Sequence, residues 1–374
     1  MASIKLFLCG DVMTGRGIDQ ILARPCDAEI HERYVESATG YVRLAEDANG
    51  PIPRGVAPSY IWGDALAELA RAKPDRRIIN LETAVTCSED WLPKGINYRM
   101  SPANVNCLTA AGIDCCVLAN NHVLDWGERG LIETVETLRA AALATAGAGA
   151  NRAQAEASAV LPVAGRGRIL VFAVCSESSG VPPDWAATDR APGVDFLPEL
   201  SPRIVERLAR RIAVAKQPGD IVVVSIHWGG NWGYAVAPEE TAFARALIDV
   251  AGVDVAHGHS SHHPKAIEVY RGKLILYGCG DFINDYEGIR GHEEFRGDLV
   301  LMYLPELEAG SGRLIQLELA VMQIRRFRVG RASAADARWL CAVLDREGRR
   351  FGTRALRGTD NRIEIAWPRQ ECDR

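Results

Sequence analysis

Residues 221–230 read IVVVSIHWGG, an apolar run that ends in His227 and two glycines. Two further stretches have the same form, IDCCVLANNH at 113–122 and GVDVAHGHSSHH at 252–263. Short apolar runs bounded by turn residues are typical of buried strands. Because polar side chains follow each run directly, the pattern predicts strands whose ends bring distant histidines and asparagines together.

Strand and helix patterns alternate along most of the chain. Strand-like runs occur at residues 4–9, 77–81, 113–119, 169–175, 221–226 and 252–256, and helical patterns at 61–72, 102–111, 127–142, 203–215 and 239–251. This alternation predicts an α/β fold with a mainly parallel sheet, whose ligands bind beyond the carboxyl ends of the strands. After His263 the pattern changes to a hairpin at 266–277 and strands near Leu299 and Leu314, so a second, antiparallel sheet is expected.

The length of 374 residues, 48% of them hydrophobic, supports one large core with an appendage. Residues 1–325 are predicted to form the main domain, with an irregular insertion at about 18–58 and a lid candidate at 176–202, which is rich in proline. Residues 326–374 are predicted to form a helix–strand extension packed on the same domain. Its helix begins after Ser333 as N-cap and runs to Glu347, and its last strand covers 362–367.

Composition excludes several classes of protein. The formal net charge of −5 argues against a nucleic-acid-binding face. No stretch approaches the roughly 20 apolar residues of a membrane span, and no charged leader or cleavage site is evident at the start of the chain. The ten cysteines include no Cys-x-x-Cys pair, so reduced thiols and a cytoplasmic location are expected.

Five of the eight histidines fall between residues 227 and 263, and a sixth is His122. Imidazole is the commonest metal ligand in proteins and titrates near neutrality, so this clustering predicts metal-assisted acid–base chemistry. Asp11 and Asn121 add oxygen donors, which makes a mixed set suited to zinc, manganese or iron, as one or two ions. The alternatives are that Asp11 and Asn121 are turn residues, that Glu82 belongs to an ion pair, and that His257 is a core histidine with a backbone partner.

Together these motifs resemble the CapA family of bacterial poly-γ-glutamate capsule synthesis proteins. The stretches that carry the resemblance are GDVM at 10–13, NLET at 80–83, ANNHVLD at 119–125, HWG at 227–229, GHSSH at 258–262 and LYGCGDF at 276–282. The resemblance implies a calcineurin-like metallophosphoesterase fold, which is a β-sandwich flanked by helices with metal ligands on loops at one edge.

The resemblance also implies roles for individual residues. The implied metal ligands are Asp11, Glu82, Asn121, His227, His259 and His262. The implied acid–base residue beside the metal is His122, with His259 and His262 as further catalytic candidates. Asp281, Asp285 and Asn80 are expected to form hydrogen bonds with the ligand side chains and so to fix their orientation.

The chain departs from the metallophosphoesterase pattern in three places. Asp11-Val12-Met13 lacks the histidine of the usual Asp-x-His, and residues 80–82 replace the usual Gly-Asp-x-x-Asp. A second metal is therefore expected to bind more weakly or not at all, and a phosphatase activity does not follow from the fold. The spacing after His259 leaves open whether His262 or His263 binds metal.

The predicted substrate is a peptide or an anionic polymer. Arg16 and Arg99 are the candidates for binding its anionic groups, whereas Lys94 is expected to carry a solvated surface charge. Trp228 and Trp232 either form an apolar wall of the pocket or pack beneath the loop that holds them.

Three functions are compatible with these parts. We expect hydrolysis by metal-activated water of a peptide-type or poly-γ-glutamate-like substrate. The first alternative is epimerisation at Cα, in which a metal acidifies the carbon and two histidines exchange its proton. The second alternative is a non-catalytic module that binds an anionic polymer.

Overall fold

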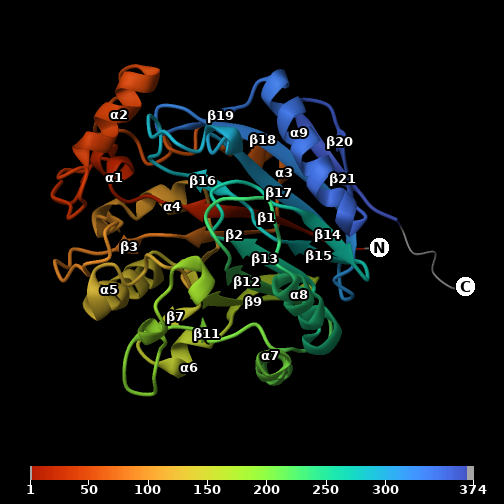
Figure 1. Ribbon diagram of the computed structural model, residues 1–374. Coiled ribbons are helices and arrows are strands. Elements are labelled where there is room, and N and C mark those ends of the chain that lie inside the picture. Colours follow the sequence, from red (N-terminus) through yellow and green to blue (C-terminus); the bar gives the residue numbers. More distant parts are fainter. Residues whose placement is uncertain (1, 369–374) are drawn as a thin grey trace, which may run out of the picture.

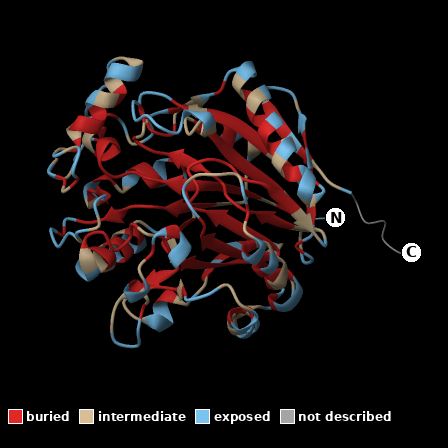
Figure 2. Ribbon diagram, viewed as in Figure 1, coloured by how far each residue is buried: buried red, intermediate tan, exposed pale blue. Residues whose placement is uncertain are grey.

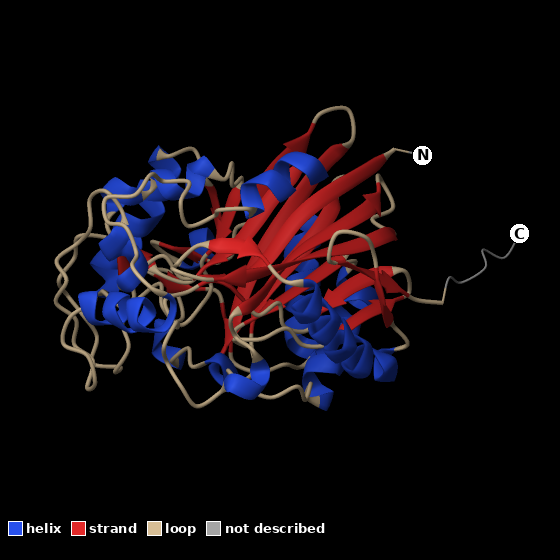
Figure 3. Cartoon of the chain, turned by 90° about the horizontal axis from the view of Figure 1, so that it is seen from above, coloured by secondary structure: helices blue, strands red, loops and turns tan. Residues whose placement is uncertain are grey.

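The computed structural model describes residues 2–368 and consists of two β-sheets with helices on their outer faces (Figures 1 and 3). In the described part of the chain, the larger sheet has ten strands in the order β20-β21-β18-β17-β1-β2-β5-β6, with β16 beside β1 and β19 beside β18. Its strands are β1 (Ser3–Val12), β2 (Arg76–Leu81), β5 (Cys115–Val117), β6 (Ala144–Ala146), β16 (Asp281–Ile283), β17 (Leu299–Glu308), β18 (Leu314–Ile324), β19 (Val329–Arg331), β20 (Arg354–Arg357) and β21 (Arg362–Ala366).

The smaller sheet has seven strands. They are β8 (Ala159–Val163), β9 (Gly167–Ser176), β11 (Phe196–Leu197), β12 (Ile221–His227), β13 (Val255–His259), β14 (Ile267–Tyr270) and β15 (Lys273–Leu276). β11, β9, β12, β13 and β15 run parallel, while β8 and β14 are antiparallel to their neighbours.

Both sheets are mixed, and the expectation of a separate antiparallel sheet is wrong. The hairpin predicted at 266–277 is present as β14 and β15, but β15 pairs parallel with β13. β17 and β18 are antiparallel to each other, and β17 pairs with the edge of β1 opposite β2. A strand edge that is left unpaired exposes backbone polar groups, and the β17–β18 hairpin covers this one.

Alternation along β9 shows how the layers are held together. Ile169 and Val171 face the larger sheet and belong to the same core as β1, β2 and β17. Leu170 and Phe172 face the other way and pack against α7 (Pro202–Ala215) and α8 (Pro238–Ala251). Figure 2 shows the result, in which the central strands are buried and the helices that cover them are exposed on their outer side. Such alternation, with both faces covered, is expected of the central strands of a layered α/β fold.

The helices largely follow the predicted ranges. Those already predicted are α3 (Ala65–Ala72), α4 (Asn106–Ala110), α5 (Gly127–Ala140), α7, α8 and α9 (Ala334–Gly348), and a short α6 (Arg152–Ala155) adds to them. The predicted N-cap of α9 is confirmed, because the Ser333 hydroxyl accepts a hydrogen bond from the backbone N–H of Asp336 at 3.1 Å. The helix predicted from residue 61 starts later, because residues 58–64 form turns.

The segment at 18–58 is not irregular throughout, contrary to expectation. It contains α1 (Gly17–Ile21) and α2 (Thr39–Asn49), and α2 buries Tyr41, Val42 and Ala45. Glycines and prolines lie on either side of α2 and interrupt the helical periodicity, so this short helix is not predicted from the sequence.

The segment at 176–202 is held by two strand pairings, one to the smaller sheet and one in a separate two-stranded sheet. β10 (Gly193–Val194) pairs with β7 (Ala148–Gly149), and β11 pairs with β9. Its role as a lid stays a prediction. A further small pair, β3 (Ala84–Val85) and β4 (Arg99–Met100), lies ahead of α4 in the sequence.

The C-terminal extension shares the larger sheet, because β21 pairs with β18. Residues 369–374 of the predicted extension lie outside the described residues. Between residues 2 and 368, no helix has the length and apolar character needed to cross a membrane. The nine described cysteines are free thiols, as the spacing predicted.

Candidate metal centre

Two neighbouring strands present four polar side chains on one buried face. Side chains alternate along a strand, so Ser225 and His227 share a face of β12, and His257 and His259 share a face of β13. The parallel register places Ser225 beside His257 and His227 beside His259. Their neighbour Ile226 packs against α7 and α8 instead. The four side chains therefore face the larger sheet.

The end of β1 supplies Asp11 to the same place. Gly10 permits this, because a Cβ on Gly10 would lie only 1.6 Å from the carbonyl oxygen of Gly280. The backbone N–H of Asp11 donates to that oxygen at 3.0 Å, and Asp11 lies in register with Asp281 of β16. Close backbone approach at a glycine thus brings two carboxylates to one strand end.

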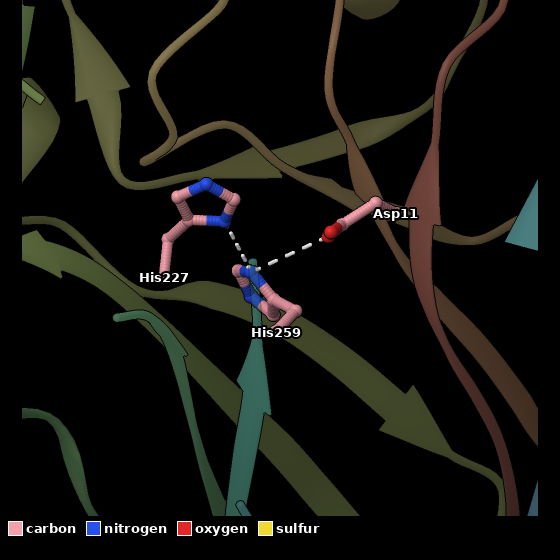
Figure 4. Close-up of side chains that lie close together, drawn as sticks. All are labelled: Asp11, His227 and His259. Atoms are coloured by element: carbon pink, nitrogen blue, oxygen red, sulfur yellow. Dashed lines mark hydrogen bonds and ion pairs between the residues drawn. The ribbon is translucent and has the colours of Figure 1, made fainter. Parts of the chain in front are cut away.

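Asp11, His227 and His259 form the first group of potential metal ligands (Figure 4). The Nδ1 atoms of His227 and His259 are 2.8 Å apart, and Nδ1 of His259 is 3.8 Å from Oδ1 of Asp11. All three side chains are buried, and one donor atom from each lies within 4.8 Å of the others. Two imidazoles and a carboxylate are a ligand set used by zinc and related ions.

A second group shares Asp11 and adds His262 and Asp281. The Nδ1 atom of His262 lies 2.9 Å from Oδ1 of Asp281, whose other oxygen accepts a hydrogen bond from Asn284 at 2.7 Å. The expected contact of Asp281 with a candidate histidine is therefore present, and its carboxylate also lies among the donor atoms. Of His262 and His263, His262 joins the cluster, while the His263 ring stacks on Phe295.

Glu82 and Asn121 lie on the other side of His227. Oδ1 of Asn121 is 3.1 Å from Nε2 of His227, and Oε1 of Glu82 is 3.9 Å from the same nitrogen. The second oxygen of Glu82 is buried and has no hydrogen-bond partner among the described residues. All six residues predicted as ligands are thus gathered in one region, and one of them has a buried carboxyl oxygen with no hydrogen-bond partner among the described residues.

The closely spaced carboxylates and neutral imidazoles of this region favour binding of a cation. Burial, and then the nearby Asp281 carboxylate, raise the pKa of Asp11 to about 7. Burial and the Asp11 carboxylate raise the pKa of Glu82 well above its ordinary value. Burial lowers the pKa values of His227 and His259 far enough to keep both rings neutral, which is the form that binds metals. These residues fit a divalent cation, which would offset the crowded negative charge.

His122 lies beside this cluster with two charged partners. Its Nδ1 is 2.7 Å from Oδ2 of Asp125, and Lys94 donates to Oδ1 of Asp125 at 2.7 Å. A carboxylate only accepts, so the His122 proton sits on Nδ1 and the lone pair on Nε2 faces Glu82 Oε1, 3.7 Å away. Burial lowers the pKa of His122 to about 4 despite Asp125, so the ring is neutral and Nε2 can accept a proton.

Asp125 is a functional candidate that the sequence did not single out, and Lys94, which was named from the sequence, has a different role from the one expected. The expectation of a solvated Lys94 is wrong, because its ammonium group donates to Asp125 and to the backbone oxygen of Asn121. The spacing of His122 and Asp125 within one turn was the available signal for the carboxylate.

Asn80 and Asp285, which were both expected to orient ligand residues, have different contacts. Asn80 donates to Oδ1 of Asp11 at 2.7 Å. Asp285 contacts no ligand candidate, contrary to expectation, and instead accepts hydrogen bonds from Nε of Arg16 at 3.1 Å and from the backbone N–H of Gly17 at 2.9 Å. Asp285 therefore fixes the turn after β1.

The two arginines predicted to bind substrate are buried and already paired. Arg16 contacts Asp285 and Glu32, at 3.0 Å for Glu32, and stacks over Tyr41. Arg99 donates to the backbone oxygen of Ser88 at 3.0 Å and stacks over Trp126. Both hold segments around the site in place, so neither presents a free cation to a ligand.

The two tryptophans have different surroundings. Trp228 is buried, packs on Tyr277 and donates to the backbone oxygen of Tyr277 at 3.0 Å, so it lies beneath the loop. Trp232 borders a cavity of about 550 Å³ together with Asn284 and Tyr286. The Trp232 ring centre is 5.3 Å from that of His262, so the cavity adjoins the second ligand group.

The candidate ligands all lie in the part of the chain that matches a known family. Residues 5–286 match the family described as bacterial capsule synthesis protein PGA_cap. A probable polyglutamine synthesis accessory protein of Mycobacterium tuberculosis is 48% identical over 364 residues, 97% of this chain and 96% of that protein. The PGA biosynthesis protein CapA of Bacillus subtilis is 29% identical over 278 residues, 74% and 62% of the two chains, and the capsule biosynthesis protein CapA of Bacillus anthracis is 30% identical over 198 residues, 51% and 45%. This chain belongs to the family of bacterial capsule synthesis proteins PGA_cap.

Proposed function

We propose that this protein is a divalent-metal-dependent enzyme that hydrolyses a peptide-type bond in a poly-γ-glutamate-like polymer, on a calcineurin-like metallophosphoesterase fold. The observation that carries the proposal is the buried Asp11, His227 and His259 group, beside an unpaired Glu82 oxygen and the His122–Asp125 pair. The names of the relatives, which refer to capsule or polyglutamine synthesis, support the polymer as the substrate class.

Asp11, His227 and His259 would hold one ion of zinc, manganese or iron, with Glu82 as a further ligand. Asp11, His262 and Asp281 would hold a second ion if one binds. When bound, a divalent ion supplies Lewis acidity, which activates water or polarises a carbonyl or carboxylate oxygen.

His122 and His262 have the opposed properties of a base and an acid. Burial keeps His122 neutral, whereas Asp281 and Asp11 outweigh the effect of burial and raise the pKa of His262. In hydrolysis, Nε2 of His122 takes a proton from water while the water oxygen attacks the carbonyl carbon. His262 gives a proton to the leaving amine nitrogen as the C–N bond breaks. This role of His262 requires that the ion is held by the first group.

The cavity beside Trp232 supports a polymer with carboxylate groups. Its volume, about 550 Å³, is in the range of ligand pockets. Arg290 and Arg325 line it, and neither guanidinium has an ion-pair partner among the described residues. Three acidic residues, Glu287, Glu293 and Asp298, line the same cavity. Asp298 is paired with Arg296, and Glu287 accepts hydrogen bonds from the backbone N–H groups of Arg326 and Phe327.

Epimerisation at Cα is the second candidate. It is favoured by the presence of two separate His–carboxylate pairs, His122–Asp125 and His262–Asp281, which can remove and return one proton. The same parts serve hydrolysis, so products must distinguish the two reactions.

The test is incubation of the metal-loaded protein with γ-linked glutamate oligomers in deuterated water, followed by mass spectrometry. Shortened products are expected. A mass gain of one at unchanged length would instead show exchange at Cα and epimerisation. Unchanged oligomers with each of the three metals would contradict both reactions and leave a binding module.

The variant His122→Ala tests the proposed role of His122 as the base. We expect turnover to fall by about 10²–10⁴-fold while metal content is kept. His31→Ala, which removes a ring stacked on the exposed Trp91, is the control and should keep full turnover. Equal turnover in the His122 variant would exclude it as the base.

A further inference from the structure

A chain of hydrogen bonds runs from His259 across the space between the sheets. Nε2 of His259 lies 2.7 Å from Oγ of Ser225, and the same Oγ lies 3.1 Å from Nδ1 of His257. Nε2 of His257 is 2.8 Å from the backbone oxygen of Cys9 on β1. Ser225, His257 and His259 are buried, so this chain is internal to the protein.

The last partner fixes the direction of every bond. A carbonyl oxygen only accepts, so Nε2 of His257 carries a proton. His257 is fully buried and contacts no carboxylate among the described residues, so its ring is neutral and its Nδ1 accepts a hydrogen bond from Oγ of Ser225. The single hydroxyl proton of Ser225 is used in that bond. Towards His259, Oγ of Ser225 can therefore only accept, and Nε2 of His259 must donate.

We infer that Ser225 and His257 are positioning residues that hold the proton of His259 on Nε2 and leave the Nδ1 lone pair free to bind a metal. That lone pair faces Asp11 and His227. The inference rests on the proposed metal site, and it does not depend on which reaction the site performs. Partners that fix the tautomer of a ligand histidine generally raise metal affinity.

A consequence follows for His227. Because Nδ1 of His259 is an acceptor, His227 faces two acceptors in the metal-free protein, Nδ1 of His259 at 2.8 Å from its Nδ1 and Oδ1 of Asn121 at 3.1 Å from its Nε2, and the one proton of a neutral ring can serve only one of them. A metal bound by both Nδ1 atoms requires that proton on Nε2, where Oδ1 of Asn121 lies 3.1 Å away as an acceptor. Metal binding therefore fixes His227 as the Nε2-protonated tautomer, while the tautomer of His259 does not change.

The direct test is nitrogen-15 NMR of histidine-labelled protein, metal-free and with one equivalent of zinc. Each signal is assigned by its disappearance from the spectrum of a variant in which one histidine has been replaced. We expect His259 to be protonated on Nε2 in both forms, and His227 to be protonated on Nε2 in the zinc-bound form. A proton on Nδ1 of His259 in the metal-free protein would overturn the inference.

Zinc affinity measured by competition with a chromogenic chelator gives the second readout. Ser225→Ala should weaken zinc binding by about 10–100-fold. Ser88→Ala is the matched control, because Ser88 is an equally buried serine whose hydroxyl donates to the backbone oxygen of Trp126. Unchanged affinity in the Ser225 variant, with the fold intact by circular dichroism, would contradict the positioning role.

Two substitutions of His257 separate hydrogen bonding from packing. His257→Gln keeps one donor and one acceptor, whereas His257→Leu fills the space and has neither, so the Gln variant should bind zinc more tightly than the Leu variant. Equal loss in both would mean that only packing matters. A wild-type protein that binds no divalent metal but has His259 protonated on Nε2 would refute the proposed metal function and confirm the hydrogen-bond chain.

Discussion

At the scale of the residue, Glu82 shows most directly why the site suits a cation. Its Oε2 atom is buried without a hydrogen-bond partner in the described chain, and two other carboxylates, Asp11 and Asp281, lie close by. An ionised carboxylate in such a place destabilises the folded state unless a positive charge is near.

This gives a prediction about pH. Burial and Asp11 raise the pKa of Glu82 in the folded protein above its unfolded value of about 4.3. As pH rises past the unfolded value, the unfolded chain loses this proton first, so the metal-free folded state loses stability until the folded pKa is passed. Glu82→Gln has no ionisable group at this position, so its stability should not fall in this pH range for this reason. With chelator present, the variant should match the wild type at pH 4.5 and have the higher melting temperature at pH 8.

Differential scanning fluorimetry across this pH range checks the prediction. Glu206→Gln, which alters an exposed glutamate on α7, is the control and should follow the wild-type curve. A Glu82 variant that is less stable than the wild type at pH 8 without metal would show that the carboxylate has a favourable partner.

At the scale of the element, the approach of β1 to the turn before β16 determines where Asp11 lies. Only a glycine fits at position 10, because the carbonyl of Gly280 occupies the space of a side chain. That oxygen belongs to the backbone, so it cannot move aside as a flexible side chain would. The register of β1 with β16 and the pairing of Asp11 with Asp281 both depend on this contact.

Gly10→Ala should therefore be severely destabilising. Overpacking of a core costs about 1–3 kcal/mol, and we expect a loss at or above the upper end, with weaker zinc binding in any folded fraction because Asp11 and Asp281 are pushed apart. Urea unfolding and zinc titration measure the two effects.

Gly230→Ala is the matched control. A Cβ at Gly230 meets no atom within 4 Å, although the residue lies in the motif that follows β12. Its stability should change by no more than about 0.5 kcal/mol. If the two alanine variants were equally stable, the close approach of β1 to Gly280 would be refuted.

At the scale of the whole molecule, the candidate ligands come from both sheets. Asp11 extends from β1 of the larger sheet, whereas His227 and His259 extend from β12 and β13 of the smaller one (Figures 1 and 4). An ion bound by all three would join the two layers, and its binding free energy would add to the stability of the fold.

Metal binding should therefore raise the melting temperature of the wild-type protein. A ligand at 100 times its dissociation constant contributes about 2.7 kcal/mol, and excess chelator should reverse the shift. His227→Ala should lose the metal-dependent shift, while His31→Ala should keep it. A melting temperature that is insensitive to zinc, manganese and iron alike would contradict the metal centre.

The sequence by itself determined the elements and the candidates for chemistry. Apolar runs and helical periodicity located most strands and helices. Polar residues at strand ends, together with the family resemblance of the motifs that contain them, indicated the residues that gather around Asp11. These features depend on neighbours within a few positions along the chain, so a local pattern is enough to find them.

Only the tertiary structure decided how those parts meet. The pairing of β17 with β1, the choice of His262 over His263, the binding of Asp285 to Arg16 and the contact of Lys94 with Asp125 all join residues whose relative position the local pattern leaves open. Strand partners and buried ion pairs are selected by long-range packing and by the cost of leaving a polar group unpaired, and neither quantity is defined until the whole chain has folded.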